Sequence, residues 1–129
     1  HLGHSFPTRR SSDLEIMNKI NISSELIRGN IDSIILRVIC DGDNYGYEII
    51  KAISKNSEGK YELKEPSLYT SLKRLESQKL IESYWGSESQ GGRRKYYRIT
   101  ELGKENYEKS LSAWKIARDL IDKLIKREG

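Results

Sequence analysis

The first half of the chain contains two runs in which apolar residues recur every three or four positions, the spacing of one helical face. The first run, over 23–40, predicts one continuous amphipathic helix. Its apolar positions are Leu26, Ile27, Ile31, Ile34, Ile35, Val38 and Ile39. A stretch rich in Asp, Asn and Gly at 41–46 predicts a turn, and the second run predicts a helix over about 47–55. We expect a short strand over 61–63.

A further helix and a hairpin are predicted beyond this strand. Proline is well tolerated in the first turn of a helix, where its missing N–H is not needed, so a third helix is expected to begin at Pro66. Its core-facing positions are Leu68, Leu72 and Leu75. The runs 80–86 and 93–99 are rich in β-formers and flank a polar, glycine-bearing loop, which predicts a β-hairpin. The expected fold class is therefore mainly α with a small β-hairpin, a winged helix-turn-helix.

The last segment, from about 101 to 127, repeats apolar residues with heptad-like spacing. These positions are Tyr107, Leu111, Trp114, Ala117, Ile121 and Leu124. Such a helix would be roughly 40 Å long, more than a domain of ~100 residues can cover. Pairing with the same helix of a second copy would bury the stripe and place two recognition helices about one DNA turn apart. We therefore expect a homodimer on a palindromic operator, with a winged helix-turn-helix domain at 17–99 and a C-terminal dimerisation helix at 100–129.

The first sixteen residues lack this periodicity. The stretch FPTRRSSDL reads as the translation of a sequencing-adapter oligonucleotide, and the single methionine of the chain, Met17, follows soon after it. We therefore expect residues 1–16 to be a non-native leader and Met17 to be the native start.

The composition argues against most enzyme chemistry. Both histidines lie in the expected leader, and the single cysteine is Cys40. This set cannot supply a structural zinc site, a Cys-His or Ser-His nucleophile pair, or a disulfide within one chain. No GxxxxGK loop is present, and no apolar run approaches the roughly 20 residues of a membrane span. We expect a cytoplasmic, non-enzymatic protein without cofactor or metal, in which Cys40 is a small buried hydrophobe rather than a redox sensor.

The net charge of +4 is concentrated in one part of the chain. Residues 60–98 hold nine basic and five acidic side chains, so this segment accounts for the whole excess. A run of charge can simply be a solvated face, but this run falls on the third helix and the hairpin. Clustering of this kind suits the neutralisation of DNA phosphates and favours binding to duplex DNA.

Four stretches strongly resemble the PadR family of winged-helix regulators: ELIRGNIDSIIL, DGDNYGYEII, EPSLYTSLKRLE and SYWGSESQGGRRKYYRIT. The resemblance covers nearly all of 24–125. Within the family, the hairpin and the single tryptophan of the last helix are most similar to LmrR-type multidrug-resistance repressors. This likeness implies a cytoplasmic homodimer that represses an efflux transporter gene and responds to planar, often cationic, drugs. It also implies that the last helix pairs with the first helix of the partner.

The resemblance assigns DNA contacts to the third helix and to the hairpin, or wing. On the helix these positions lie off the leucine stripe, where hydroxyl donors and cations suit the major groove: Ser67, Tyr69, Thr70, Lys73 and Arg74. On the wing, Gly91 and Gly92 allow a tight turn. The cations that would grip the backbone or the minor groove are Arg93, Arg94 and Lys95.

Three aromatic residues of this region have alternative interpretations. Tyr45 and Tyr47, near the start of the second helix, can hydrogen-bond phosphates, or one of them can close the core, because tyrosine is intermediate in burial. We expect Trp85 to pack between the wing and the body without a functional role.

The resemblance also predicts a ligand site. In LmrR-type proteins a tryptophan of the last helix from each subunit sandwiches a flat ligand at the dimer centre, and Trp114 stands at the matching position. Packing of Trp114 in the dimer core is an equal alternative. The other positions carried over are Leu26, Gly29, Asp32 and Ser33. Arg118 replaces an acidic ligand contact and Ser33 an apolar one, which argues against a cationic ligand, although Asp32 could still supply negative charge.

The sequence thus predicts a DNA-binding transcriptional repressor that a planar aromatic small molecule, bound at the dimer interface, releases from DNA. The alternative is a winged-helix module that binds protein or RNA without sensing a ligand.

Overall fold

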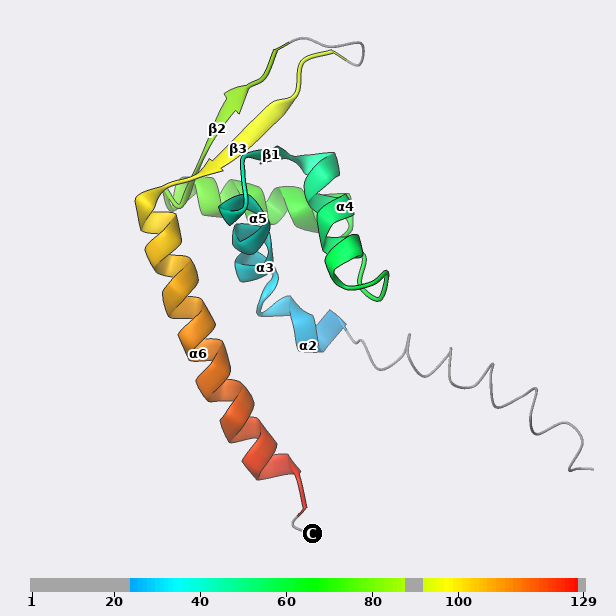
Figure 1. Ribbon diagram of the computed structural model, residues 1–129, viewed down its shortest axis with the longest axis vertical. Coiled ribbons are helices and arrows are strands. Elements are labelled where there is room, and N and C mark those ends of the chain that lie inside the picture. The colour runs from blue at the N-terminus through cyan, green and yellow to red at the C-terminus, as the bar shows by residue number, and fades with distance from the viewer. Residues whose placement is uncertain (1–23, 88–91, 128–129) are drawn as a thin grey trace, which may run out of the picture.

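The computed structural model describes residues 24–87 and 92–127. In this part of the chain helices predominate, and a three-stranded sheet lies at one end (Figure 1). The elements are α2 (Ser24–Arg28), α3 (Ile31–Cys40), β1 (Asn44–Tyr45), α4 (Gly46–Asn56), α5 (Glu65–Ser77), β2 (Ile81–Trp85), β3 (Lys95–Ile99) and α6 (Glu101–Ile125). The expected fold class is confirmed. The expected leader at 1–16, the start at Met17 and Gly91 lie outside the described residues.

Helices α3, α4 and α5 share one apolar core with the sheet, and we call this unit, residues 31–87 and 92–99, the head. Its most completely buried large side chains are Ile35, Leu36, Ile39, Ile49, Leu68, Leu72, Leu75 and Ile81. The predicted leucine stripe of α5 is therefore confirmed. Burial of an aliphatic side chain contributes about 1.5–3 kcal/mol relative to exposure, so the head is stabilised by its own residues.

The expected continuous helix over 23–40 is wrong, because Gly29 and Asn30 divide it. The backbone N–H of Asn30 donates to the carbonyl of Ile27 at 2.8 Å, which closes a turn after α2. Glycine costs about 1 kcal/mol in a helix interior relative to alanine, and asparagine favours caps over interiors. The break turns α2 away from the axis of α3, and none of the residues of α2 is buried.

The third strand is also in a different place from the one expected. Residues 61–63 form no strand, although Leu63 is buried in the core. The third strand is instead β1, within the predicted turn at 41–46, with Asn44 opposite Tyr97 and Tyr45 opposite Tyr96. The resulting order is β1-β3-β2, so β1 occupies the edge of β3 that the hairpin leaves open.

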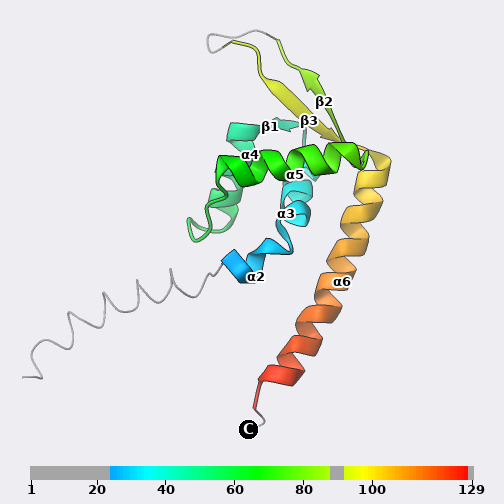
Figure 2. The same ribbon diagram turned by 180° about the vertical axis from the view of Figure 1, so that it is seen from behind.

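Two burial predictions are wrong. Trp85, at the end of β2, is 58% exposed, because the hairpin extends beyond the helices and nothing described lies over its outer end (Figure 2). Cys40 is exposed as well. It follows Ile39 at the last position of α3, and a residue there points away from the helical face that Ile35 and Ile39 bury.

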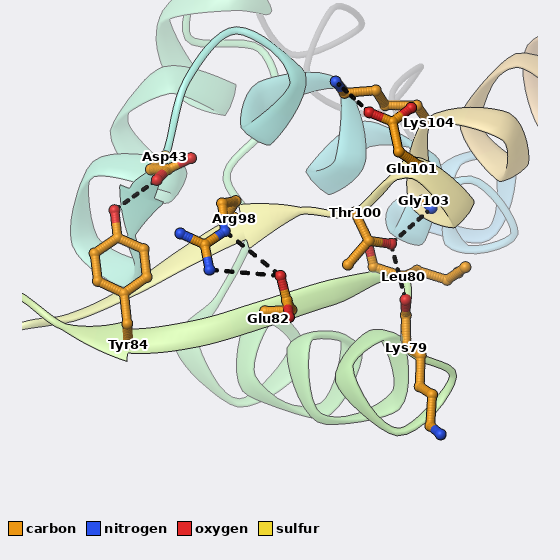
Figure 3. Close-up of polar contacts among 10 residues, drawn as sticks. All are labelled: Asp43, Lys79, Leu80, Glu82, Tyr84, Arg98, Thr100, Glu101, Gly103 and Lys104. Carbon is orange, nitrogen blue, oxygen red and sulfur yellow. Dashed lines mark hydrogen bonds and ion pairs between the residues drawn. The ribbon is translucent and has the colours of Figure 1, made fainter.

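Helix α6 is attached to the head at a tight joint (Figure 3). The Thr100 hydroxyl accepts a hydrogen bond from the Gly103 N–H at 2.9 Å and donates one to the Lys79 carbonyl at 2.8 Å. A Cβ at Gly103 would lie 2.1 Å from the carbonyl oxygen of Leu80, so only glycine allows this approach. Beyond the joint α6 runs away from the sheet, and every described residue from Ser112 onward is exposed.

Candidate nucleic-acid interface and groove

Helix α5 presents a polar face to solvent opposite its leucine stripe. Four of the predicted contacts on it are exposed: Ser67, Tyr69, Thr70 and Lys73. The Thr70 hydroxyl donates to the carbonyl of Pro66 at 2.8 Å and so lies along the helix. Lys73 makes no ion pair within the described part of the chain, which leaves its ammonium available to a phosphate.

Arg74 differs from its neighbours, because its guanidinium is held by a carboxylate. Its Nε and Nη2 donate to the two oxygens of Asp32 at 2.8 and 2.7 Å, and Nη2 also donates to the buried Ser71 hydroxyl at 3.1 Å. The hydrogen bond to Asp32 raises the pKa of Arg74. This bidentate pair joins α5 to the first turn of α3, so Arg74 as a DNA contact stays a prediction that requires the pair to open.

Tyrosines surround the start of α4. Tyr45 is partly buried, with its ring 5.3 Å from that of Tyr96 in an edge-on arrangement. Tyr47 is exposed, and the Lys51 ammonium lies 5.4 Å from its ring centre. Neither ring belongs to the main core. Tyr47 is the more exposed of the two, so it is the better placed to reach a phosphate. Its role stays a prediction.

Basic side chains of the wing lie against aromatic rings. The Arg93 guanidinium carbon is 5.4 Å from the ring of Trp85, and that of Arg94 is 4.8 Å from the ring of Tyr45. Lys95 lies opposite Trp85 in the ladder and is exposed. Gly92 has φ of 88°, a left-handed conformation that glycine adopts without strain.

The two faces of the hairpin are used differently. On the outer face, the Tyr84 hydroxyl donates to Asp43 at 2.6 Å, which raises the pKa of Tyr84, and the Arg98 guanidinium pairs with Glu82 at 3.5 Å (Figure 3). On the inner face, the Ser83 hydroxyl donates to Glu76 of α5 at 2.6 Å. The outer face is thus occupied by contacts within the chain, and the inner face is directed toward α5.

Two adjoining apolar grooves separate α6 from α2 and α3. The first, of about 500 Å³, reaches toward the core, and we call it the inner groove. The second, of about 780 Å³, follows the exposed half of α6, and we call it the outer groove. Leu26, Ser33 and Trp114 line both. These volumes are in the range of small-molecule sites.

The grooves bring together most of the predicted ligand residues. Gly29 and Arg118 line the outer groove beside Leu26, Ser33 and Trp114. Asp32 lines neither groove and is paired with Arg74, so it does not supply free negative charge there. Trp114 is 43% exposed, and the Arg118 guanidinium carbon lies 5.1 Å from its ring centre.

Sequence reasoning missed part of the inner groove. Tyr61, Arg37 and Tyr107 line it alongside Trp114. Tyr107 stands on the heptad stripe and could have been found from its spacing. Tyr61 could not, because its proximity to α6 comes from the chain path after α4. Burial raises the pKa of Tyr61.

The described residues contain no cluster of three or more His, Cys, Asp or Glu side chains able to hold a metal ion. A helix that combines the length and the apolar character required to cross a bilayer is likewise absent from this part of the chain.

Comparisons with known proteins agree with this architecture. The family model "Transcriptional regulator PadR-like family" matches residues 35–109. A relative from Lysinibacillus sphaericus described as "Uncharacterized protein X" is 46% identical over 101 residues, covering 78% of this chain and 93% of its own. Among solved structures, a transcriptional regulator from Clostridium thermocellum is 42% identical in sequence and superposes with a TM-score of 0.75. The match covers 80% of this chain and 100% of that one. A PadR family transcription regulator from Clostridium difficile is 38% identical with a TM-score of 0.65, covering 75% and 99%.

Proposed function

Because this chain belongs to the PadR-like family of transcriptional regulators, we propose that it is a repressor that binds a palindromic DNA operator as a homodimer. Family membership makes it a DNA-binding regulator rather than an enzyme. The observation that best supports the proposal is the exposed Lys73 on α5 together with the cations of the wing. The Ser83–Glu76 hydrogen bond holds wing and helix against each other, so both can engage one duplex.

The dimer is supported by the apolar surface of α6. Ile116, Leu120, Leu124 and Ile125 are all more than half exposed in the single chain. The apolar side chains of this 25-residue helix gain stability only when another surface buries them. The equivalent helix of a second copy would bury them symmetrically.

The DNA proposal is tested by mobility shift at several salt concentrations, with a duplex that the wild-type protein selects from a random-sequence pool. Each lost phosphate contact reduces the slope of log affinity against log salt by about 1, so Arg93→Ala is expected to lower this slope. Arg28→Ala removes the same side chain from α2, far from the wing, and is expected to leave the slope unchanged. Affinity that does not vary with salt, or equal slopes for both variants, contradicts the proposal. Binding to RNA or protein alone would favour the module alternative.

We further propose that a planar aromatic effector binds along Trp114 in the two grooves. Arg118 already places a cation over the indole ring, so a neutral or anionic effector suits this site better than a cationic one. Quenching of tryptophan emission by matched anionic and cationic planar dyes tests this. Trp114→Phe is expected to abolish quenching, and Arg118→Gln to shift the preference toward the cationic dye. Quenching that disappears only in Trp85→Phe places the dye elsewhere.

Derepression requires that the effector bind one spacing of the two heads better than another. An effector with equal affinity for both spacings does not change their populations. Operator affinity measured with and without a saturating dye decides this, and unchanged affinity contradicts an effector-driven switch. An LmrR-type role and a cytoplasmic location stay predictions.

A further inference from the structure

Trp85 is a large apolar side chain that the head does not cover. It is 58% exposed, although tryptophan is one of the side chains that gain most from burial. Its one ring contact in the described residues is the Arg93 guanidinium at 5.4 Å. An aromatic ring kept in solvent at the end of a strand is a candidate for contact with a partner.

The strand geometry determines which way Trp85 points. Alternate residues of β2 share a face, so Ile81, Ser83 and Trp85 lie on the inner face of the hairpin. Ile81 is buried and Ser83 is hydrogen-bonded to Glu76 of α5. Trp85 stands about 7 Å further along this face, at the outer end of β2. Its ring therefore borders the space between the wing and the exposed side of α5.

The charges beside Trp85 indicate what occupies this space. Lys95 is directly opposite it in the ladder, and Arg93 lies against its ring. Glu82, the acidic residue of β2, is on the outer face and pairs with Arg98. On the inner face, the Glu76 carboxylate lies nearer the core and accepts the Ser83 hydrogen bond. An aromatic ring flanked by two cations matches a polyanion with apolar surfaces, and duplex DNA meets this description.

We infer that Trp85 is a DNA-contacting residue of the wing, its ring against the sugar edges or in the minor groove and Arg93 and Lys95 on the flanking phosphates. This inference rests on the proposed function as a DNA-binding repressor. Apolar side chains inserted from a protein into the minor groove are a general mode of DNA binding. The indole N–H can in addition donate to a minor-groove or phosphate acceptor.

Fluorine NMR of the wild-type protein labelled with fluorotryptophan tests the contact directly. The chain has two tryptophans, so two resonances are expected, and Trp85→Phe identifies that of Trp85. On saturation with the selected duplex, the Trp85 resonance is expected to shift, and its solvent-isotope effect between light and heavy water to fall by half or more. The Trp114 resonance serves as the internal reference for a ring outside the DNA interface.

Affinity measurements separate a ring contact from a phosphate contact. Trp85→Ala is expected to weaken duplex binding about tenfold with an unchanged salt slope, because it removes no charge. Lys95→Ala is expected to lower the slope by about 1. Trp85→Phe should recover part of the affinity, and circular dichroism checks that each variant is folded.

The failures of the two proposals are distinguishable. If the wild-type protein binds no duplex, the proposed function fails and the Trp85 contact fails with it. If it binds the duplex while the Trp85 resonance and the affinity of Trp85→Ala stay unchanged, only the Trp85 contact is overturned. If the solvent-isotope effect of the Trp85 resonance falls as protein concentration rises without DNA, this face contacts a second copy. That result would also overturn the inference.

Discussion

The head and the C-terminal half of α6 bury their apolar residues to opposite extents. In the head, Ile35, Ile49 and Leu68 are completely inaccessible to solvent, whereas Leu124 and Ile125 on α6 are each 75% exposed. The head therefore holds together through contacts within one chain. The far half of α6 carries exposed apolar side chains, and these add stability only where another surface buries them.

The joint between these regions is closely packed and hydrogen-bonded. Thr100 caps α6 and hydrogen-bonds the end of the α5–β2 connection, and Gly103 is packed against the Leu80 carbonyl. Any change in the direction of α6 therefore acts on the base of the wing. The proposed effector in the grooves would act on the spacing of the two heads of the proposed dimer through this connection.

The largest expected effect is in the head. Leu72→Ala leaves a cavity in the core and is expected to lower the free energy of unfolding by about 2–5 kcal/mol, measured by denaturant titration. Leu102→Ala makes the same change at a half-exposed position and should stay within about 0.5 kcal/mol of wild type. Equal losses in the two variants would mean that the head does not derive its stability from this core.

The next effect is on association through α6. Leu120 is 54% exposed and lines neither groove, so Leu120→Glu should leave the head folded while placing a charge in the proposed dimer contact. We expect the dimer dissociation constant to rise about a hundredfold, roughly 3 kcal/mol, in sedimentation equilibrium. Lys115→Gln changes the charge by the same amount on the polar side of α6 and should leave the constant within about threefold of wild type. A dimer that tolerates Leu120→Glu uses a different surface.

The joint gives an intermediate effect. A methyl group at Gly103 must displace the Leu80 backbone, so Gly103→Ala is expected to destabilise the protein by about 1–3 kcal/mol. Thermal and denaturant unfolding measure this loss. Gly29→Ala is the matched control, because a Cβ there meets nothing within 4 Å, and it should be neutral or slightly stabilising. Equal stabilities for the two variants would show that α6 is not held tightly at the sheet.

The smallest effect concerns the tie between α3 and α5. Asp32→Asn breaks the bidentate pair with Arg74, which is partly exposed, and is expected to cost about 1 kcal/mol or less in urea titration. Glu62→Gln neutralises a more exposed ion pair with Lys64 and should have no measurable effect. Indistinguishable results would assign no stabilising role to the Asp32–Arg74 pair.

A local period predicted structure correctly in α5 and α6, although the same kind of period ran unbroken across Gly29 and Asn30, where the helix is divided. The leucine spacing in 68–75 correctly predicts the buried face of α5, and the run around Trp114 correctly predicts a long helix with an apolar stripe. The clustering of cations on the wing was visible in the same way. Each of these features depends on residues within a few turns of one another, so the linear pattern contains the necessary information.

The sequence by itself thus determined the elements from α5 to α6, the core face of α5 and the location of the positive charge. Only the tertiary structure decided that β1 forms at Asn44–Tyr45, that Arg74 is held by Asp32 from 42 residues away, and that Trp85 stands uncovered. Strand pairing and ion pairing join groups that are distant in the chain, and burial depends on which element lies above a side chain. None of these has a local period, so they arise only when the head has folded.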